Sequence, residues 1–145
     1  ISLVFGCGGE RDFKKRRLMA KIAKSFCKKI YVTDDNPRKE NPKKIRKEIT
    51  KHLTGLNYFN IGDRSKAIKV SILNAEPNEI ILIAGKGHEN YQDYGNKIIS
   101  ISDREIVKSF EKILCILFAR INILNIRSKN KANIIITPKK PNSSE

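Results

Sequence analysis

Residues 34–40, which read DDNPRKE, combine an amide, a proline and a guanidinium directly after a short apolar run. Pro37 fixes its own φ and disfavours a helical conformation at Asn36, so the loop is stiffened. The planar fork of Arg38 can bind a carboxylate or a phosphate through two parallel hydrogen bonds. These residue types indicate recognition of an anion, although D-x-N-P strings also form plain turns.

Two glycine-containing loops carry further charged groups. GCGGERD starts at Gly6 and includes Arg11, which could contact an anion. GKGHE starts at Gly85 and ends at Glu89, which could accept hydrogen bonds from an ammonium group. Neither loop contains the G-x-G-x-x-G fingerprint or the Gly-Lys-Ser/Thr of a Walker A motif. Each loop on its own could therefore be a tight strand-to-helix turn.

The three loops gain a joint meaning if the strands before them are parallel, because ligands bind outside the carboxyl ends of such strands. Arg11 and Arg38 would then bind a carboxylate and Glu89 an ammonium group, as found together in an amino acid. Asn36 would add an amide to the same site. No Ser-His-Asp, Cys-His or paired-carboxylate arrangement competes with this reading, so we predict no catalytic residue in this chain.

Strand and helix patterns alternate along the chain and predict how the loops are positioned. Apolar runs at 2–5, 30–33, 58–61 and 80–84 are separated by amphipathic segments that begin near residues 14, 42 and 64, and a last helix follows Ser102. This order predicts an α/β fold, a Rossmann-like, doubly wound and mostly parallel sheet. The short run 98–100, after a turn at 94–97, is predicted to be an antiparallel edge strand.

The amphipathic segments also predict which side chains face the core. The predicted inward residues are Leu18, Ile22, Ala23 and Phe26 in the first helix, Ile45, Ile49 and Leu53 in the second, and Ala67, Ile68, Ile72 and Leu73 in the third.

The chain is strongly basic, with 30 Lys and Arg against 15 Asp and Glu and a formal net charge of +15. Such a charge suits polyanion partners. The lysines are scattered, however, and few aromatic residues lie among them, so a base-stacking surface is poorly supported. We therefore do not expect nucleic acid as a partner. A basic nucleic-acid-binding module is kept as the alternative function, on the strength of the net charge alone.

Metal, disulfide and membrane signals are absent from the sequence. The three cysteines have no C-x-x-C spacing and the two histidines are far apart, so no metal site and no disulfide scaffold are predicted. No signal peptide or membrane-spanning segment is visible. We expect a cytoplasmic protein without a membrane partner.

Five strings in the sequence resemble the C-terminal domain of the Mur ligases. They are VFGCGGERDFKKR (4–16), VTDDNPRKE (32–40), IGDRSKAI (61–68), LIAGKGHENYQ (82–92) and SDRE (102–105). Their order and spacing are similar to those of the family members that add meso-diaminopimelate, over about residues 2–112. The resemblance implies the fold of that domain, without its first strand–helix unit.

The resemblance also implies a function in peptidoglycan synthesis. The family joins an amino acid, here meso-diaminopimelate, to a UDP-linked muramoyl peptide, here UDP-N-acetylmuramoyl-L-Ala-D-Glu. ATP converts the peptide carboxylate to an acyl phosphate that the incoming amine attacks, and Mg²⁺ assists. ATP and Mg²⁺ are thus the implied cofactors of the full-length enzyme, an ATP-dependent ligase that forms a peptide bond.

Residue roles follow from the resemblance, position by position. The implied specificity motif is Asp35, Asn36, Pro37 and Arg38. The implied meso-diaminopimelate-binding residues are Arg11, Asn36, Arg38, Gly85 and Glu89. In the family the D-N-P-R motif distinguishes diaminopimelate from lysine, and Arg38 with Asn36 would bind the extra carboxylate at the far end of diaminopimelate.

Several family features are missing from this chain, among them a P-loop, Mg²⁺ ligands and the domains that would bind the UDP-linked dipeptide. We therefore expect the chain alone to be inactive as a ligase. Residues 1–114 are predicted to form the Mur ligase domain and residues 115–145 a basic, disordered tail. A decayed remnant of a ligase gene is a further alternative.

Overall fold

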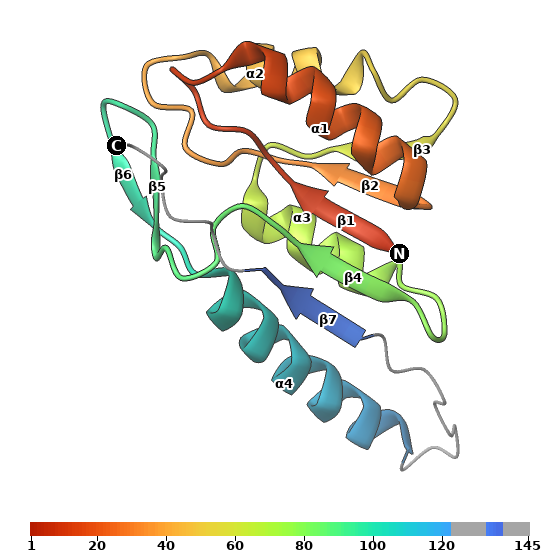
Figure 1. Ribbon diagram of the computed structural model, residues 1–145. Helices are drawn as coiled ribbons and strands as arrows, with labels where there is room; N and C mark the ends of the chain where they lie inside the picture. Colours follow the sequence, from red (N-terminus) through yellow and green to blue (C-terminus); the bar gives the residue numbers. More distant parts are fainter. Residues whose placement is uncertain (123–132, 138–145) are drawn as a thin grey trace.

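The computed structural model describes residues 1–122 and 133–137 (Figure 1). The elements are β1 (Ser2–Phe5), α1 (Phe13–Phe26), β2 (Lys29–Val32), α2 (Pro42–Thr50), β3 (Asn57–Asn60), α3 (Arg64–Leu73), β4 (Ile80–Ile83), β5 (Tyr91–Asp93), β6 (Ile98–Ser100), α4 (Asp103–Asn122) and β7 (Asn133–Ile136).

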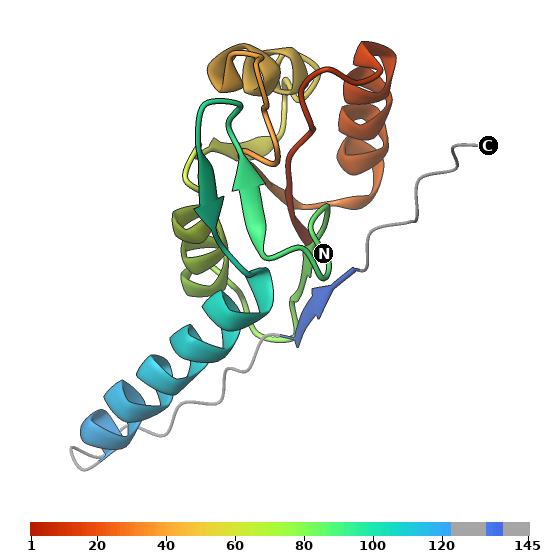
Figure 2. The ribbon, with the colours of Figure 1, turned by 90° about the vertical axis from the view of Figure 1, so that its left-hand side faces the viewer.

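Five of the strands form one parallel sheet in the order β3-β2-β1-β4-β7. Strand β1 lies at its centre and pairs in parallel with β2 and with β4. Helices α1 and α2 pack on one face of the sheet, and α3 and α4 on the other (Figures 1 and 2). The predicted doubly wound, parallel α/β fold is confirmed.

Short polar side chains start the helices where the sequence predicts. Asp12 accepts a hydrogen bond from the backbone N–H of Lys14, Asn41 accepts from Lys43 and Lys44, and Asp63 accepts from Lys66. Pro42 stands at the first position of α2, where no N–H is needed. These caps fix where each strand-to-helix loop ends.

The antiparallel strand at 98–100 exists, but not at the edge of the main sheet. It is β6, and it pairs with β5 in a separate two-stranded sheet, with Gln92 opposite Ile99. The turn at 94–97 reverses the chain at once, so the nearest partner of β6 is the segment just before it. The edge position beside β4 is taken by β7.

The predicted disorder of residues 115–145 is wrong for the part that the structure describes. Helix α4 continues to Asn122, and β7 pairs in parallel with β4, with Ile134 opposite Ile81. A run of isoleucines favours a strand, and this signal was outweighed by the basic composition around it. Residues 123–132 and 138–145 lie outside the described part. The domain boundary at residue 114 stays a prediction.

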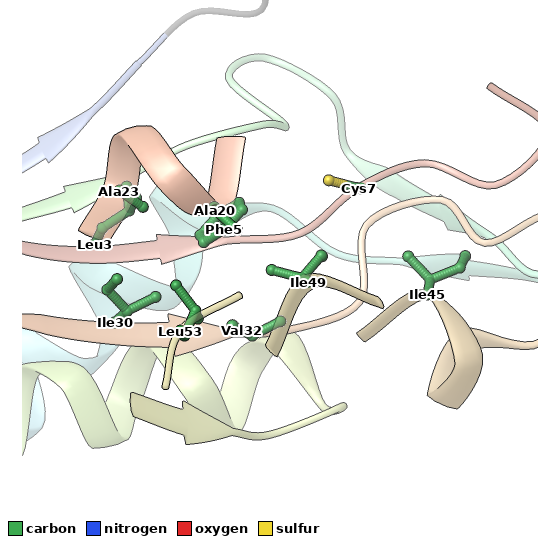
Figure 3. Close-up of a cluster of buried hydrophobic side chains, with 10 residues drawn as sticks. All are labelled: Leu3, Phe5, Cys7, Ala20, Ala23, Ile30, Val32, Ile45, Ile49 and Leu53. Carbon is green, nitrogen blue, oxygen red and sulfur yellow. The ribbon is translucent and has the colours of Figure 1, made fainter. Parts of the chain in front are cut away.

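Two hydrophobic clusters hold the layers together. One lies between the sheet and helices α1 and α2, and includes Phe5, Val32 and Ile49 (Figure 3). The other lies on the opposite face and includes Tyr31, Ile68 and Ile83. Ile45, Ile49 and Leu53 of the second predicted helix are buried as expected, as are Ala67 and Ile68 of the third, whereas Ile72 is only partly buried and Leu73 is exposed.

The inward face of α1 matches the prediction only at Ala23. Leu18, Ile22 and Phe26 are 57%, 52% and 74% exposed, while Ala20 and Ala23 are buried. Small alanines let α1 approach the sheet closely, and its inward face also carries the charged Arg16. An apolarity pattern could not find a face made of alanines and an arginine. None of the helices in the described residues is long and apolar enough to cross a membrane.

Candidate functional site

The loops after β1, β2 and β4 meet at the carboxyl edge of the sheet because these three strands are parallel neighbours. The first loop packs directly against the second. A Cβ on Gly6 would lie 2.3 Å from the carbonyl oxygen of Thr33, and one on Gly9 would lie 1.9 Å from that of Pro37. The Gly9 N–H also donates to the Asn36 carbonyl at 2.9 Å. Gly6 and Gly9 therefore allow the loop after β1 to lie in close contact with the loop after β2.

Asn36 is buried, and its side-chain amide is fixed by three partners. Its Oδ1 accepts from the Lys86 ammonium at 2.6 Å and from the Asp93 backbone N–H at 3.1 Å. Its Nδ2 donates to Glu89 Oε2 at 3.2 Å. Asn36 and Glu89, which the sequence places in different loops, are thus in direct contact.

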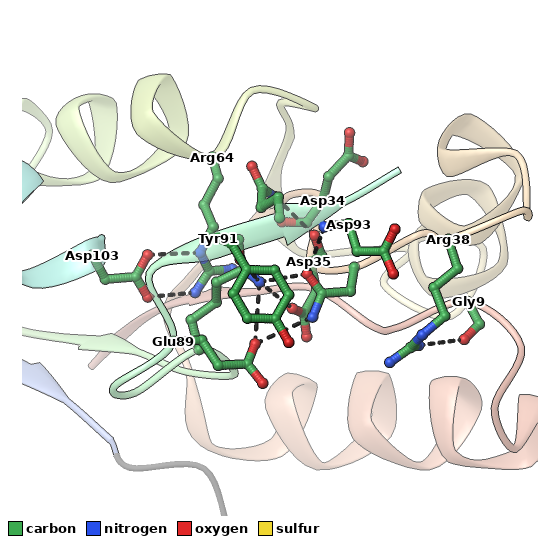
Figure 4. A network of polar contacts seen from close by, with 12 residues as sticks. Gly9, Asp34, Asp35, Arg38, Arg64, Glu89, Tyr91, Asp93 and Asp103 are labelled. Carbon is green, nitrogen blue, oxygen red and sulfur yellow. Dashed lines mark hydrogen bonds and ion pairs between the residues drawn. The ribbon is translucent and has the colours of Figure 1, made fainter. Parts of the chain in front are cut away.

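Lys86 lies at the centre of the polar network and is fully buried. Besides Asn36, its ammonium donates to the Tyr91 carbonyl at 2.6 Å and to Glu89 Oε2 at 3.3 Å, and it lies 3.3 Å from Asp35 Oδ1 (Figure 4). Lys86 is not assigned to the site in the sequence analysis. The position between two glycines carries no signal that the side chain turns inward.

Arg38 adopts a left-handed conformation with φ of 52°, which is uncommon for a residue with a side chain. Its backbone N–H donates to the Asp93 carbonyl and its Nη1 to the Gly9 carbonyl, at 2.9 and 2.7 Å (Figure 4). The described residues offer no partner to its other guanidinium N–H groups.

Arg11 is exposed and lies near Arg38 at the glycine loop. A Cβ on Gly8 would lie 3.1 Å from Arg38 Nη1 and 3.6 Å from Arg11 Cδ. The two arginine side chains therefore flank the same glycine, and both can serve one anionic group.

Gly85 lies next to Asp35 at the end of β4. Its φ of 117° suits only glycine, and a Cβ there would lie 3.4 Å from Asp35 Oδ2. The five predicted binding residues thus lie at one edge of the sheet, in two groups. Arg11 and Arg38 form the first group, beside Gly8. The second group is Asn36 in contact with Glu89, together with Gly85, which lies close to Asp35.

Gln92, Arg46 and Tyr94, which the sequence analysis did not assign to the site, hold the D-N-P-R loop in place. Gln92 donates to the carbonyls of Asp34 and Asp35, both at 2.9 Å. Asp34 binds Arg46 and accepts a 3.0 Å hydrogen bond from the Tyr94 hydroxyl. Burial and the Asp34 carboxylate raise the pKa of Tyr94 to about 12, so it stays a donor. These contacts join distant segments, and local sequence gives no sign of them.

Arg16 links the site loops to the helices. It binds Glu40 and Glu48 and donates to the Gly8 carbonyl at 3.2 Å. The site itself offers no activated nucleophile, because burial raises the pKa of the nearby Cys7 thiol to about 12. In residues 1–122 and 133–137, no group of three or more His, Cys, Asp or Glu side chains is arranged so that it could hold a metal ion. The arrangement suits recognition of a ligand with both charge signs.

Comparisons with known proteins agree with this geometry. A family profile described as "Mur ligase, glutamate ligase domain" matches residues 1–87. The UDP-N-acetylmuramoyl-L-alanyl-D-glutamate--2,6-diaminopimelate ligase of Rickettsia bellii is 53% identical over 106 residues, which cover 73% of this chain and 22% of that protein. A relative of the same name, with the number 1, from Clostridium acetobutylicum is 45% identical over 111 residues, covering 77% of this chain and 23% of that protein.

A solved structure points the same way. It is described as a UDP-N-acetylmuramoyl-L-alanyl-D-glutamate--2,6-diaminopimelate ligase and superposes with a TM-score of 0.73 at 37% identity, covering 78% of this chain and 24% of the other. The chain spans less than a quarter of the length of these relatives. Since the family profile matches more than half of its residues, the chain belongs to the Mur ligase family.

Proposed function

We propose that this chain is the amino-acid-binding part of a UDP-N-acetylmuramoyl-L-alanyl-D-glutamate–2,6-diaminopimelate ligase, which adds meso-diaminopimelate to the UDP-linked muramoyl dipeptide during peptidoglycan synthesis. The observation that carries the proposal is the 3.2 Å contact between Asn36 and Glu89 beside the two arginines that flank Gly8. Carboxylate-binding and ammonium-binding groups thereby share one sheet edge. The names of the relatives support the choice of ligand, and the comparisons give the nucleic-acid-binding alternative no support.

Each predicted residue has a role in this proposal. Arg38 binds the distal carboxylate of diaminopimelate through the guanidinium edge that Gly9 leaves open, and Arg11 adds a second cation. Glu89 and the Gly85 carbonyl receive the distal ammonium group. A lysine ligand has no such carboxylate, so it would leave Arg38 unpaired, which disfavours lysine.

ATP and Mg²⁺ belong to the proposal for the whole enzyme. They would activate the peptide carboxylate for attack by the bound amine. The residues described in this chain do not fit either group, since the glycine loop lacks the Lys-Ser/Thr of a phosphate loop and no group of acidic side chains is arranged to hold a metal ion. The part of this chain is to bind and orient the amino acid.

Calorimetry with meso-diaminopimelate and the 145-residue chain tests the proposal. We expect Arg38→Ala to weaken binding by about tenfold to a hundredfold, because a charged hydrogen-bond pair contributes about 1.5–3 kcal/mol. Arg104→Ala, which removes an exposed arginine on α4, should bind as the parent does.

Lysine provides the second arm of the experiment. It should bind the parent more weakly than diaminopimelate and should be insensitive to Arg38→Ala. Equal diaminopimelate affinities of Arg38→Ala and the parent would contradict the role of Arg38. Absence of binding to the parent would contradict the proposal for the isolated chain. A phosphate-release assay with the chain alone should show no diaminopimelate-dependent turnover.

A further inference from the structure

A cleft of about 510 Å³ opens between α1 and α2, and none of the residues that line it belongs to the D-N-P-R loop. The two helices lie next to each other on one face of the sheet (Figure 1). Lys14 and Arg17 of α1 line one wall, and Lys44 of α2 with Lys51 and His52 just beyond it line the other.

The positive charge of this cleft is not neutralised within the described residues. Glu48 also lines it, but its carboxylate is bound to Arg16 at 2.7 Å. None of Lys14, Arg17, Lys44 and Lys51 has a carboxylate within 4.0 Å in residues 1–122 or 133–137. Four cations therefore face one concave space without a counter-charge.

His52 reports the same excess of positive charge. Its pKa is lowered first by partial burial and then by the charges of Lys51, Arg17 and Lys21. A neutral imidazole is favoured where the surrounding potential is positive. An anion in the cleft would reverse this effect, so His52 is a built-in reporter of occupancy.

We propose that the cleft between α1 and α2 binds an oligophosphate, a chain of two or more phosphate groups. Cations on both walls can each meet one phosphate along such a chain, so a chain of phosphates can form more ion pairs here than a single phosphate can. A nucleic acid fits less well, because strand-tracking surfaces combine an open basic groove with successive aromatic rings, and Phe13 is the one Phe, Tyr or Trp among the residues lining this cleft. This inference does not depend on the proposed ligase function.

The test is a proton NMR titration of the two histidines, His52 and His88, against pH at low salt, with and without inorganic triphosphate. We expect the pKa of His52 to rise by about half a unit or more on binding, since a nearby opposite charge favours the imidazolium. His88 follows β4, outside the cleft, so its resonance at a given pH should be the same with and without triphosphate. ATP, which carries the same phosphate chain, should give a similar shift.

Matched variants separate a site from general charge. The double variant Lys44→Gln/Lys51→Gln should abolish the His52 response to triphosphate. Lys69→Gln/Lys112→Gln removes the same charge from exposed positions on α3 and α4 and should keep it. Equal loss in both variants would overturn the proposal.

Two competitors complete the test. Orthophosphate that moves His52 as far as triphosphate at equal concentration would overturn the need for a phosphate chain. A short single-stranded oligonucleotide that displaces triphosphate at a lower concentration would overturn the proposal in favour of nucleic-acid binding. The proposal is supported only if both competitors fail.

Discussion

A fully buried lysine between two carboxylates needs a reason, because desolvation of its ammonium is costly unless every N–H finds a partner. Lys86 meets this condition through the Asn36 and Tyr91 oxygens, both at 2.6 Å, and the carboxylates of Asp35 and Glu89. Because Asn36 Oδ1 is taken by Lys86, the amide must turn its donor toward Glu89. Lys86 thus positions the side chains that would bind the ligand.

Removing this ammonium tests the role at the scale of one residue. Lys86→Met should lower the free energy of unfolding by about 3–5 kcal/mol, since it leaves buried charges without their partner. Lys69→Met, at an exposed position of α3, should change it by no more than about 0.5 kcal/mol. Urea unfolding followed by circular dichroism measures both. Equal stability of Lys86→Met and the parent would show that the network is not needed for the fold.

The proposed binding residues could be named from the sequence because their chemistry is local. The proline beside Asn36, the glycines near Arg11 and the carboxylate of Glu89 are visible in short strings. Lys86, by contrast, donates to the side-chain oxygen of Asn36, which lies 50 positions earlier in the chain. Gln92 donates to the carbonyl of Asp34, which lies 58 positions earlier. No local pattern encodes such contacts.

At the scale of elements, a buried ion pair joins the starts of α3 and α4. Arg64 donates to both oxygens of Asp103, at 2.8 and 2.7 Å, and to the Ala84 carbonyl at 3.0 Å (Figure 4). Both side chains are fully buried. The pair connects two helices to the end of β4, and so fixes the strand that leads into the Gly85 loop.

A double-mutant cycle tests this connection. Arg64→Met and Asp103→Leu should each cost about 3–5 kcal/mol, because each leaves an unpaired buried charge. The double variant should cost clearly less than the sum of the two. Disruption of the exposed Glu105–Lys108 pair should cost no more than about 1 kcal/mol. Strictly additive losses in urea melts would mean that the two charges do not stabilise each other.

Helices and strands were predicted well where the hydrophobic pattern was the only strong signal in the sequence, and poorly where charged or small residues stood within that pattern. The four strands at 2–5, 30–33, 58–61 and 80–84 all lie in the parallel sheet, within a residue of their predicted bounds. In α1, by contrast, alanines and Arg16 face the sheet, and the larger apolar side chains do not. Strand β7 was missed because its isoleucines stand in a basic, polar segment.

At the scale of the whole molecule, Glu79 ties three strands at the amino edge of the sheet, opposite the site. It accepts from Ser2 of β1, from Lys29 of β2 at 3.2 Å, and from the Glu76 N–H at 2.7 Å in the turn before β4. Burial tends to raise the pKa of this carboxyl, but these hydrogen bonds outweigh it and hold the pKa below its ordinary value. The charged form is therefore favoured in the folded chain.

This shift predicts how stability depends on pH. A carboxyl with a lower pKa in the folded than in the unfolded state contributes stability above the unfolded pKa and loses it as pH falls through the folded value. The chain should accordingly lose stability from about pH 4.5 downward. Glu79→Gln should be less stable near neutral pH and should lose less on acidification, because a glutamine has no such proton to take up.

Urea midpoints measured from about pH 7 to about pH 3 would check the prediction against Glu111→Gln, which neutralises an exposed carboxyl on α4. The control should keep the acid response of the parent. If Glu79→Gln and the parent fall in parallel, other carboxylates control the acid response. If they converge at low pH, the amino edge that joins β1, β2 and β4 is where acid weakens the sheet.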